Sequence, residues 1–213
     1  MKYLTVVGML LISLVAVAQN ETAYVELKNE GNEALRSNDF ATALQKYEAA
    51  LAVWPEEEPI DGAMVFNLAT SARRVSDNEK ALDYYQQSAE LGYRPDFSTY
   101  YIASSLNSLG KDAEMEQVLL KAIDEYKTSS VLGHMKKMLT TYYLKQGAEP
   151  FNQAAQTLAS AANADPEQYD EITARANESF AEAKPWFEKV LEIDPGNENA
   201  QSSLREINSR IAN

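Results

Sequence analysis

The feature that most constrains the fold of this chain is a short pattern that returns at a nearly constant interval. Residues 38–55 and 77–95 both carry an alanine, a leucine next to it, a tyrosine four positions after the alanine, and a small residue three positions later. Ala43 and Ala81 hold the same place in these two segments, and Met115 holds it in the third, at 110–127. Because positions four and seven apart share one face of a helix, each segment predicts an amphipathic helix.

A second amphipathic helix is predicted ahead of each of these segments, with Gly31, Ala69 or Ala103 at its centre. A glycine inside a helix costs roughly 0.5–1 kcal/mol relative to alanine. Gly31 therefore predicts that another part of the chain approaches the backbone closely there. Helix pairs that repeat at roughly 34 residues form a solenoid, in which each pair buries its apolar face against the next. The sequence thus predicts an all-α helix–turn–helix solenoid.

This pattern resembles the tetratricopeptide repeat (TPR). The first repeat carries the resemblance in a series of small, turn and aromatic residues that ends in proline: Gly31, Ala34, Asn38-Asp39-Phe40, Ala43, Tyr47, Ala50 and Pro55. Later repeats keep the apolar and small positions Leu68, Ala69, Ala81, Tyr85, Ser88, Ile102, Ala103, Leu106, Gly110, Leu119 and Ala122. The resemblance implies a right-handed superhelix as a single domain over 19–213, with repeats at about 24–57, 62–95, 96–129 and an expanded 130–195, and a capping helix at 197–212.

The last predicted repeat is less regular than the others. Its first helix is expected at 133–146 and a further helix near 150–163, after which Asp165 can cap a new helix with Pro166 in its first turn. The helical pattern then runs on to Ile193, so we expect an extra helix or a long helical arm inserted in this repeat. Proline removes a backbone hydrogen bond, so a kink or a break is expected at Pro185.

The N-terminal segment 1–18 predicts a secretory signal peptide. Lys2 precedes an apolar run from Leu4 to Ala18, and the small residues Ala16 and Ala18 fit a cleavage site. About 15 apolar residues are short for a spanning helix, so no membrane span is expected in the mature chain, although an uncleaved anchor is the alternative. The chain resembles small exported repeat proteins of Gram-negative bacteria, which implies the periplasm.

Composition excludes several classes of protein. The chain has no cysteine, which excludes disulfide bonds and thiolate metal sites. Its net charge is −13, and Lys2 is the only charged residue of the predicted signal, so the mature chain carries −14. A surface this acidic repels the backbone of nucleic acids, so no nucleic acid is expected as a partner.

No set of catalytic residues is recognisable in the sequence. His134 is the single histidine, so a metal site with two histidines cannot form. The sequence also contains no Gly-rich phosphate loop and no GxSxG nucleophile turn. We therefore expect that the protein is not an enzyme and that it needs no cofactor.

In TPR proteins the first helix of each pair lines a concave groove in which partners bind, and the resemblance implies the same here. The four windows 25–38, 62–75, 97–110 and 133–146 together hold seven basic and three acidic residues, in a chain that is acidic as a whole. A basic groove implies a protein or peptide partner, with an acidic segment or a terminal carboxylate drawn into it. The candidate groove residues are basic, aromatic and polar side chains on these helices: Lys28, Asn32, Arg36, Phe66, Asn67, Thr70, Arg73, Arg74, Phe97, Tyr100, Tyr101, Ser104, Lys137 and Lys145.

Chaperone-binding members of the TPR family hold the terminal carboxylate of a peptide with a clamp of five residues. Lys28, Asn32 and Asn67 match three of the clamp positions. The other two positions are normally basic but fall here on Phe97 and Tyr101, so a carboxylate would lack its strongest partners. This departure argues against a true clamp.

These observations leave three functional hypotheses. The first is an exported, non-catalytic adaptor or scaffold that binds an extended peptide or a partner helix in its groove. The alternative is a structural subunit of a cell-envelope or secretion assembly, which docks through the C-terminal arm at 149–213. The third is an enzyme or a sugar-binding module that uses the groove aromatics, and the absence of a catalytic set argues against it.

Overall fold

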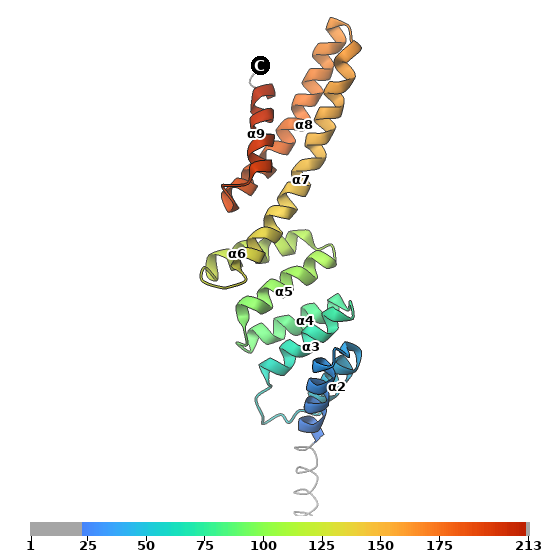
Figure 1. Cartoon of the computed structure of the whole chain (residues 1–213), viewed down its shortest axis with the longest axis vertical. Helices are drawn as coiled ribbons and strands as arrows, with labels where there is room; N and C mark the ends of the chain where they lie inside the picture. The colour runs from blue at the N-terminus through green and yellow to red at the C-terminus, as the bar shows by residue number, and fades with distance from the viewer. Residues whose placement is uncertain (1–22, 212–213) are drawn as a thin grey trace, which may run out of the picture. The chain divides into compact units, whose positions relative to one another are not determined.

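Residues 23–211 are described by the structure, a computed structural model, apart from the side chains of Asn163 and Glu167. All regular secondary structure within these residues is helical (Figure 1), which confirms the predicted all-α class. The predicted signal peptide at 1–18 lies outside the described residues. Over 23–211, no helix combines the length and the apolar character that crossing a bilayer requires.

The sequence predicts one domain over 19–213, whereas packing divides the chain into two compact units, one ending at Val131 and the other beginning at Leu132. The helices of the first unit are 23–36, α2 (Phe40–Ala52), α3 (Gly62–Arg74), α4 (Asn78–Glu90), α5 (Pro95–Ser108) and α6 (Asp112–Glu125). From α2 to α6, each helix packs against the next one along the chain. This sequential packing is the helix–turn–helix solenoid that the repeat pattern predicts.

The turns within the three helix pairs of the first unit share one construction. Asn38, Ser76 and Gly110 have positive φ angles of 61°, 66° and 71°, and each follows the first helix of its pair. In two of the three pairs the next residue, Asp39 or Asp77, caps the second helix by accepting a hydrogen bond from a backbone N–H three positions later. Left-handed backbone at a helix end followed by an aspartate cap is a compact way to reverse the chain.

Replacing Ser76 with glycine is expected to raise the free energy of unfolding of the first unit by about 0.5–1 kcal/mol. Serine has a Cβ that clashes in the left-handed conformation, whereas glycine adopts φ 66° without this cost. Urea unfolding followed by far-UV circular dichroism measures the change.

The converse substitution, Gly110→Ala, serves as the matched control. A Cβ added at Gly110 has no atom within 4 Å, so the substitution tests backbone strain without a packing change. We expect it to lower the free energy of unfolding by about 1 kcal/mol. A gain on Ser76→Gly without a loss on Gly110→Ala would contradict the shared role of these positions.

Packing in the core of the first repeat explains why residue 31 is a glycine. A Cβ built on Gly31 lies 2.7 Å from two ring carbons of Tyr47, which is fully buried on α2. The ring of Tyr47 therefore lies directly on the backbone of the first helix. Tyr47 is also part of the buried cluster that joins the first helix pair to Met64 and Leu68 of α3. The close approach that Gly31 predicts is confirmed.

The second unit is built from two long helices and a shorter one: α7 (Leu132–Ser160), α8 (Pro166–Ile193) and α9 (Glu198–Ile211), with a 3-10 turn at Ala161–Asn163. One prediction about this region is wrong, and of the kink or break expected at Pro185 only the break is excluded. The expected separate helices at 133–146 and 150–163 are one helix, α7, which contains Pro150. In addition, α8 runs through Pro185 without a break.

Packing explains why both prolines are accommodated inside helices. α7 and α8 form the most extensively packed helix pair among the described residues. Phe151, the residue after Pro150, lies edge-on to Phe180 and Phe187 of α8, with ring centroids 5.4 and 5.8 Å apart. Burial of such rings outweighs the loss of one backbone hydrogen bond at each proline.

Candidate functional site

A cluster of three rings and two guanidinium groups joins α3, α4 and α5 in the first unit. We call Phe66, Tyr85, Tyr101, Arg73 and Arg94 the arginine–aromatic cluster. Phe66 and Arg73 come from α3, Tyr85 from α4 and Tyr101 from α5, while Arg94 lies in the turn just before α5. The cluster includes three predicted groove residues and two residues outside the predicted first helices.

The three rings of the cluster contact one another. Tyr85 and Tyr101 are stacked, with ring centroids 5.0 Å apart and an interplanar angle of 20°. Phe66 is edge-on to both, at 5.3 Å from Tyr85 and 6.0 Å from Tyr101. Tyr85 is fully buried and Phe66 nearly so, whereas Tyr101 is half-buried. Tyr101 is therefore the ring of the cluster that combines a buried support with access to solvent.

Each guanidinium group of the cluster stacks on an aromatic ring. The Cζ atom of Arg73 lies 4.7 Å from the ring centroid of Tyr101. The Cζ atom of Arg94 lies 3.9 Å from the centroid of Phe97 and 5.5 Å from that of Phe66. Such cation–π contacts hold a guanidinium group in place and leave its N–H groups able to bind a carboxylate.

The two arginines of the cluster have no carboxylate partner in the part of the chain that the structure describes. Over residues 23–211, no ion pair includes Arg73 or Arg94. The Nε atom of Arg73 is buried and has no hydrogen-bond partner among the described residues. Because this Nε is shielded from solvent, a carboxylate of another molecule would bind the terminal N–H groups of Arg73 and not the Nε.

The hydroxyl groups near Arg73 are satisfied within the protein. Thr70 Oγ1 donates to the carbonyl oxygen of Phe66 at 2.9 Å and lies 3.0 Å from the phenol oxygen of Tyr85, so the Tyr85 hydroxyl donates to it. Burial raises the pKa of Tyr85 above its ordinary value, and the contacts with Thr70 and Arg73 oppose this rise. Tyr85 is therefore neutral at physiological pH and supports the cluster without adding charge.

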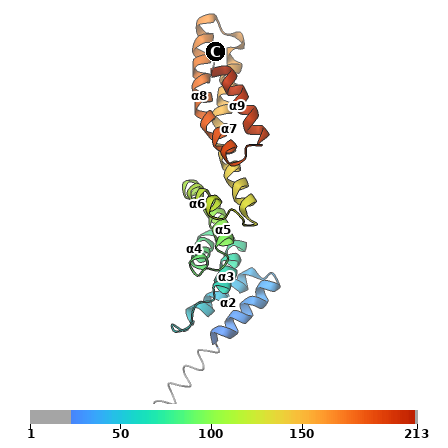
Figure 2. The same ribbon diagram turned by 90° about the vertical axis from the view of Figure 1, so that its left-hand side faces the viewer.

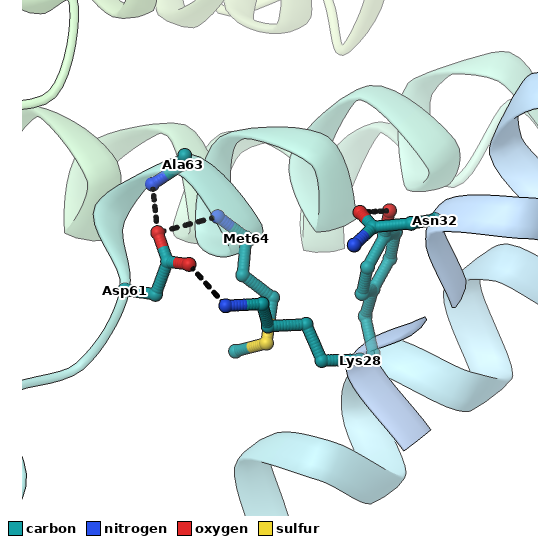
Figure 3. Close-up of polar contacts among 6 residues, drawn as sticks. Lys28, Asn32, Asp61, Ala63 and Met64 are labelled. Atoms are coloured by element: carbon teal, nitrogen blue, oxygen red, sulfur yellow. Dashed lines mark hydrogen bonds and ion pairs between the residues drawn. The ribbon is translucent and has the colours of Figure 1, made fainter. Parts of the chain in front are cut away.

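Lys28, one of the predicted basic groove residues, forms an ion pair with Asp61. Its Nζ atom lies 2.8 Å from Asp61 Oδ2 (Figure 3), while Asp61 Oδ1 accepts the backbone N–H groups of Ala63 and Met64 at 2.9 and 3.2 Å. Burial raises the pKa of Asp61, but Lys28 and the two N–H groups outweigh it, so this pKa lies below its ordinary value. Asp61 thus caps α3 and ties it to the first helix.

Replacing Asp61 with alanine is expected to lower the free energy of unfolding by about 1–2 kcal/mol, because the substitution removes a helix cap and a partly exposed ion pair together. Asp77→Ala is the matched control, since Asp77 caps α4 through Lys80 N without a lysine ion pair. We expect a smaller loss there, of about 1 kcal/mol. Urea unfolding compares the two, and equal losses would mean that the Lys28 ion pair adds nothing.

Asn32 and Asn67, the two predicted polar groove residues of the clamp pattern, lie near a buried tyrosine. The Tyr47 hydroxyl donates to Asn32 Oδ1 at 2.8 Å (Figure 3). Burial raises the pKa of Tyr47 to about 12, although a hydrogen bond with Asn67 lowers it in part. Asn32 therefore accepts the hydrogen bond of a core hydroxyl, and Lys28 is paired with Asp61, so two of the three clamp-like residues have structural partners.

The remaining candidates are distributed over several helices. The Cζ atom of Arg74 lies 4.4 Å from the ring centroid of Phe40, so this arginine packs toward α2. Tyr100 lies beside Tyr101, with centroids 5.1 Å apart. Arg36 is exposed on the first helix and Ser104 is half-buried on α5. Lys137 and Lys145 belong to α7 in the second unit, so each unit presents its own basic residues.

Two members of the cluster were missed by the sequence analysis. Tyr85 lies on a second helix and Arg94 lies in a turn, so neither falls in the windows that the resemblance assigns to the groove. Arg94 has a left-handed backbone with φ 45°, and no feature of the sequence marks this. Among the described residues, no three His, Cys, Asp or Glu side chains lie close enough together to hold a metal ion.

No protein-family model matches the chain. The chain is similar to the Photosystem I assembly protein Ycf3 of Acaryochloris marina, with 36% identity over 85 residues, and spans half the length of that protein and 39% of its own. It is also similar to a Protein STIP1 homolog of Dictyostelium discoideum, with 29% identity over 103 residues, which cover 47% of this chain and 17% of that protein.

A solved structure shares the fold over most of the chain. A TPR repeats protein from Bacteroides fragilis superposes with a TM-score of 0.55 at 18% sequence identity, covering 87% of this chain and 98% of that one. At this level of identity the likeness concerns the fold. The helix–turn–helix arrangement described above is therefore that of a tetratricopeptide-repeat solenoid.

Proposed function

We propose that this chain, whose fold is that of a tetratricopeptide-repeat solenoid, is a non-catalytic adaptor that binds an acidic segment of a partner protein. The observation that carries the proposal is Arg73, a half-buried guanidinium group that is stacked on Tyr101 and has no carboxylate partner among the described residues. Carboxylates bind guanidinium groups through paired N–H···O bonds, so an aspartate or glutamate side chain, or a terminal carboxylate, would supply the acceptor.

The aromatic part of the cluster favours a peptide over a simple anion. Tyr101 and Phe97 are half-buried on α5 and each contacts one of the two arginines, while the half-buried Tyr100 lies next to Tyr101. Tyrosine and arginine are enriched where proteins bind one another, because they combine apolar area with hydrogen-bonding groups. A partner segment with acidic residues next to apolar ones matches this surface. The similarity to proteins named for assembly of a photosystem supports an adaptor role as well.

Export to the periplasm is part of this proposal and rests on residues 1–18, which have the pattern of a secretory signal. Detection of a chain shortened by these residues in a periplasmic fraction tests it. An intact chain in the cytoplasm would contradict it.

The binding site is tested with two sets of short fluorescent peptides, one rich in Glu, Asp and Leu and the other with lysine in place of the acidic residues. We expect the acidic set to bind the full chain and Arg73→Gln to weaken that binding by at least about tenfold, because the stacked guanidinium group is lost. Fluorescence anisotropy provides the affinities.

Arg205→Gln is the matched control, because Arg205 is an exposed arginine on α9 in the second unit and the change in charge is the same. Its effect is expected to be less than about twofold, as for a distant exposed charge. Arg73→Lys adds a second test, since lysine keeps the positive charge but lacks the planar guanidinium group that stacks on an aromatic ring. Equal binding of acidic and basic peptides, or equal effects of Arg73→Gln and Arg205→Gln, would overturn the proposal.

A further inference from the structure

A cavity of about 460 Å³ lies within the second unit, and side chains of α7, α8 and α9 all line it. We call it the α9 cavity. α7 and α9 both pack on α8, and α9 runs alongside the C-terminal half of α8 (Figure 2). None of the groove residues predicted from the sequence belongs to its lining. A ligand of this cavity would therefore be recognised by residues that have no part in the predicted groove.

The α7 side of the α9 cavity is an apolar floor. Leu144, Ala148 and Phe151 share one face of α7, and Phe187 of α8, which is 3% exposed, completes this side. The rings of Phe151 and Phe187 are edge-on, with centroids 5.8 Å apart, and a Cβ built on Gly147 lies 3.1 Å from Phe187 Cζ. The floor is held in place, because Phe187 packs directly on the backbone of α7.

The α9 side of the cavity is a polar wall. It is formed by side chains that share one helix face through their spacing, at Asn199, Ser202, Ser203 and Glu206. The buried residues of α9, Ala200 and Ile207, occupy other helical positions. α9 thus packs on its neighbours through apolar residues, and the polar wall is not needed for this packing.

Most of the polar side chains of the cavity are not used inside the protein. Four of them form no hydrogen bond with another described residue: Asn152 of α7 and Asn199, Ser202 and Ser203 of α9. Hydroxyl groups elsewhere in the helices bond a carbonyl oxygen four residues earlier, as those of Ser71 and Ser108 do at 2.9 and 3.0 Å. The carboxamide and hydroxyl groups of the cavity can therefore bind a ligand without losing an internal hydrogen bond.

The polarity of the lining restricts the class of ligand. Glu206 is the one charged residue among the described residues that line the cavity, and its Oε1 atom lies 3.9 Å from Nη2 of Arg210. An anionic ligand would meet this carboxylate without a basic residue in the lining. A purely apolar ligand would remove water from the polar wall without replacing its hydrogen bonds, which is costly. The cavity thus fits a neutral ligand with one apolar face and several hydrogen-bonding groups.

A sugar ring combines these two properties. It carries C–H groups on its faces and hydroxyl groups around its edge. Each hydroxyl group both donates and accepts, which matches carboxamide and hydroxyl side chains that do the same and a carboxylate that accepts. The volume of the cavity also lies within the about 300–1,000 Å³ that is usual for small-molecule sites.

We propose that the α9 cavity binds a neutral sugar of one or two rings. The C–H face of one ring lies on Leu144 and Phe151. Its hydroxyl groups exchange hydrogen bonds with Asn199, Ser203 and Glu206. The chain then has a sugar site in its second unit that is separate from the arginine–aromatic cluster in its first unit.

Saturation-transfer NMR followed by calorimetric titration of the full chain tests this proposal. The panel consists of cellobiose, maltose, lactose and N,N′-diacetylchitobiose, each paired with the analogue in which one CH₂OH group is a carboxylate. We expect at least one neutral disaccharide to bind with a dissociation constant of about 1 mM or lower. Its acidic analogue is expected to bind about fivefold more weakly, because Glu206 repels it. Absence of binding throughout the panel, or equal or tighter binding of the acidic analogues, would overturn the proposal.

Variants of the polar wall locate the bound disaccharide. The double substitution Asn199→Ala/Ser203→Ala removes two hydrogen-bonding side chains and is expected to raise the dissociation constant at least about tenfold. The matched control is Asn208→Ala/Ser209→Ala, the same residue types at exposed positions of α9 outside the cavity, with an expected effect below about twofold. Alanine is the best helix former, so both variants retain α9. Equal effects of the two variants would contradict a site in the cavity.

The arginine–aromatic cluster is the competing location for a sugar, because Tyr101 has a half-buried ring there. Loss of disaccharide binding in Tyr101→Ala, with none in Asn199→Ala/Ser203→Ala, would overturn the proposal. The peptide experiment on Arg73 is independent of this one. We expect Asn199→Ala/Ser203→Ala to bind the acidic peptides like the parent chain, and Arg73→Gln to bind the disaccharide like the parent chain.

Discussion

Replacing Gly31 with valine is expected to lower the free energy of unfolding of the first unit by about 3 kcal/mol. Even the Cβ of an alanine would lie 2.7 Å from two ring carbons of Tyr47, and valine adds two methyl groups beyond it. The ring cannot move aside at low cost, because Tyr47 is fully buried and its hydroxyl is bonded to Asn32. The gain in helix propensity over glycine is below about 1 kcal/mol and does not offset this clash.

Trp54 fluorescence during urea unfolding measures the effect locally. Trp54 packs against the core cluster that contains Tyr47, and its ring centroid lies 4.5 Å from that of Tyr24 on the first helix. Trp186 is the other tryptophan of the chain, so the substitution Trp186→Phe leaves Trp54 as the single reporter. The experiment is carried out in that background.

Gly133→Ala is the matched control for the glycine at position 31. Gly133 also lies in a helix, α7, but a Cβ added there has no atom within 4 Å. Because Gly133 belongs to the second unit, this variant is followed through Trp186 in a Trp54→Phe background, and it is expected to leave the stability of that unit unchanged or to raise it by up to about 1 kcal/mol. A Gly31→Val variant as stable as the parent would mean that the helix pair does not depend on the contact between Gly31 and Tyr47.

The helix pairs of the first unit were predictable because their signals are local. Small residues and tyrosines at helical spacing specify which face of each helix is buried, and Gly31 marks the closest approach. The second unit was harder to predict, because Pro150 and Pro185 are breakers by local propensity and only contacts with distant residues reveal that the helices continue. Phe151 meets Phe180 and Phe187 from the other long helix.

The candidate site was predictable only in part, and for the same reason. Phe66, Thr70 and Arg73 share one face of α3 through their spacing, and this face can be read from the sequence. The ion pair of Lys28 with Asp61 joins residues 33 positions apart, and the position of Arg94 depends on a left-handed turn. Neither has a periodic signal, so the sequence predicts Lys28 as a groove residue without its partner Asp61 and does not mark Arg94.

Replacing Phe180 with alanine is expected to lower the free energy of unfolding of the second unit by about 4 kcal/mol. Phe180 is fully buried on α8 and lies edge-on to Phe151, next to Pro150 of α7. Removing its ring leaves a cavity at the point where both long helices depend on tertiary contacts, and a packed interior relaxes only partly around such a cavity. The substitution therefore tests whether packing, rather than propensity, holds α7 together across Pro150.

Trp186 reports this transition in a Trp54→Phe background, because its indole packs near Tyr143, with ring centroids 6.1 Å apart, within the second unit. Tyr169→Ala is the matched control on the same helix, since Tyr169 is 51% exposed, and its effect is expected to stay within about 0.5 kcal/mol. If Phe180→Ala costs no more than Tyr169→Ala, the contact between Phe151 and Phe180 does not stabilise α7, and the continuity of this helix through Pro150 must come from its own residues.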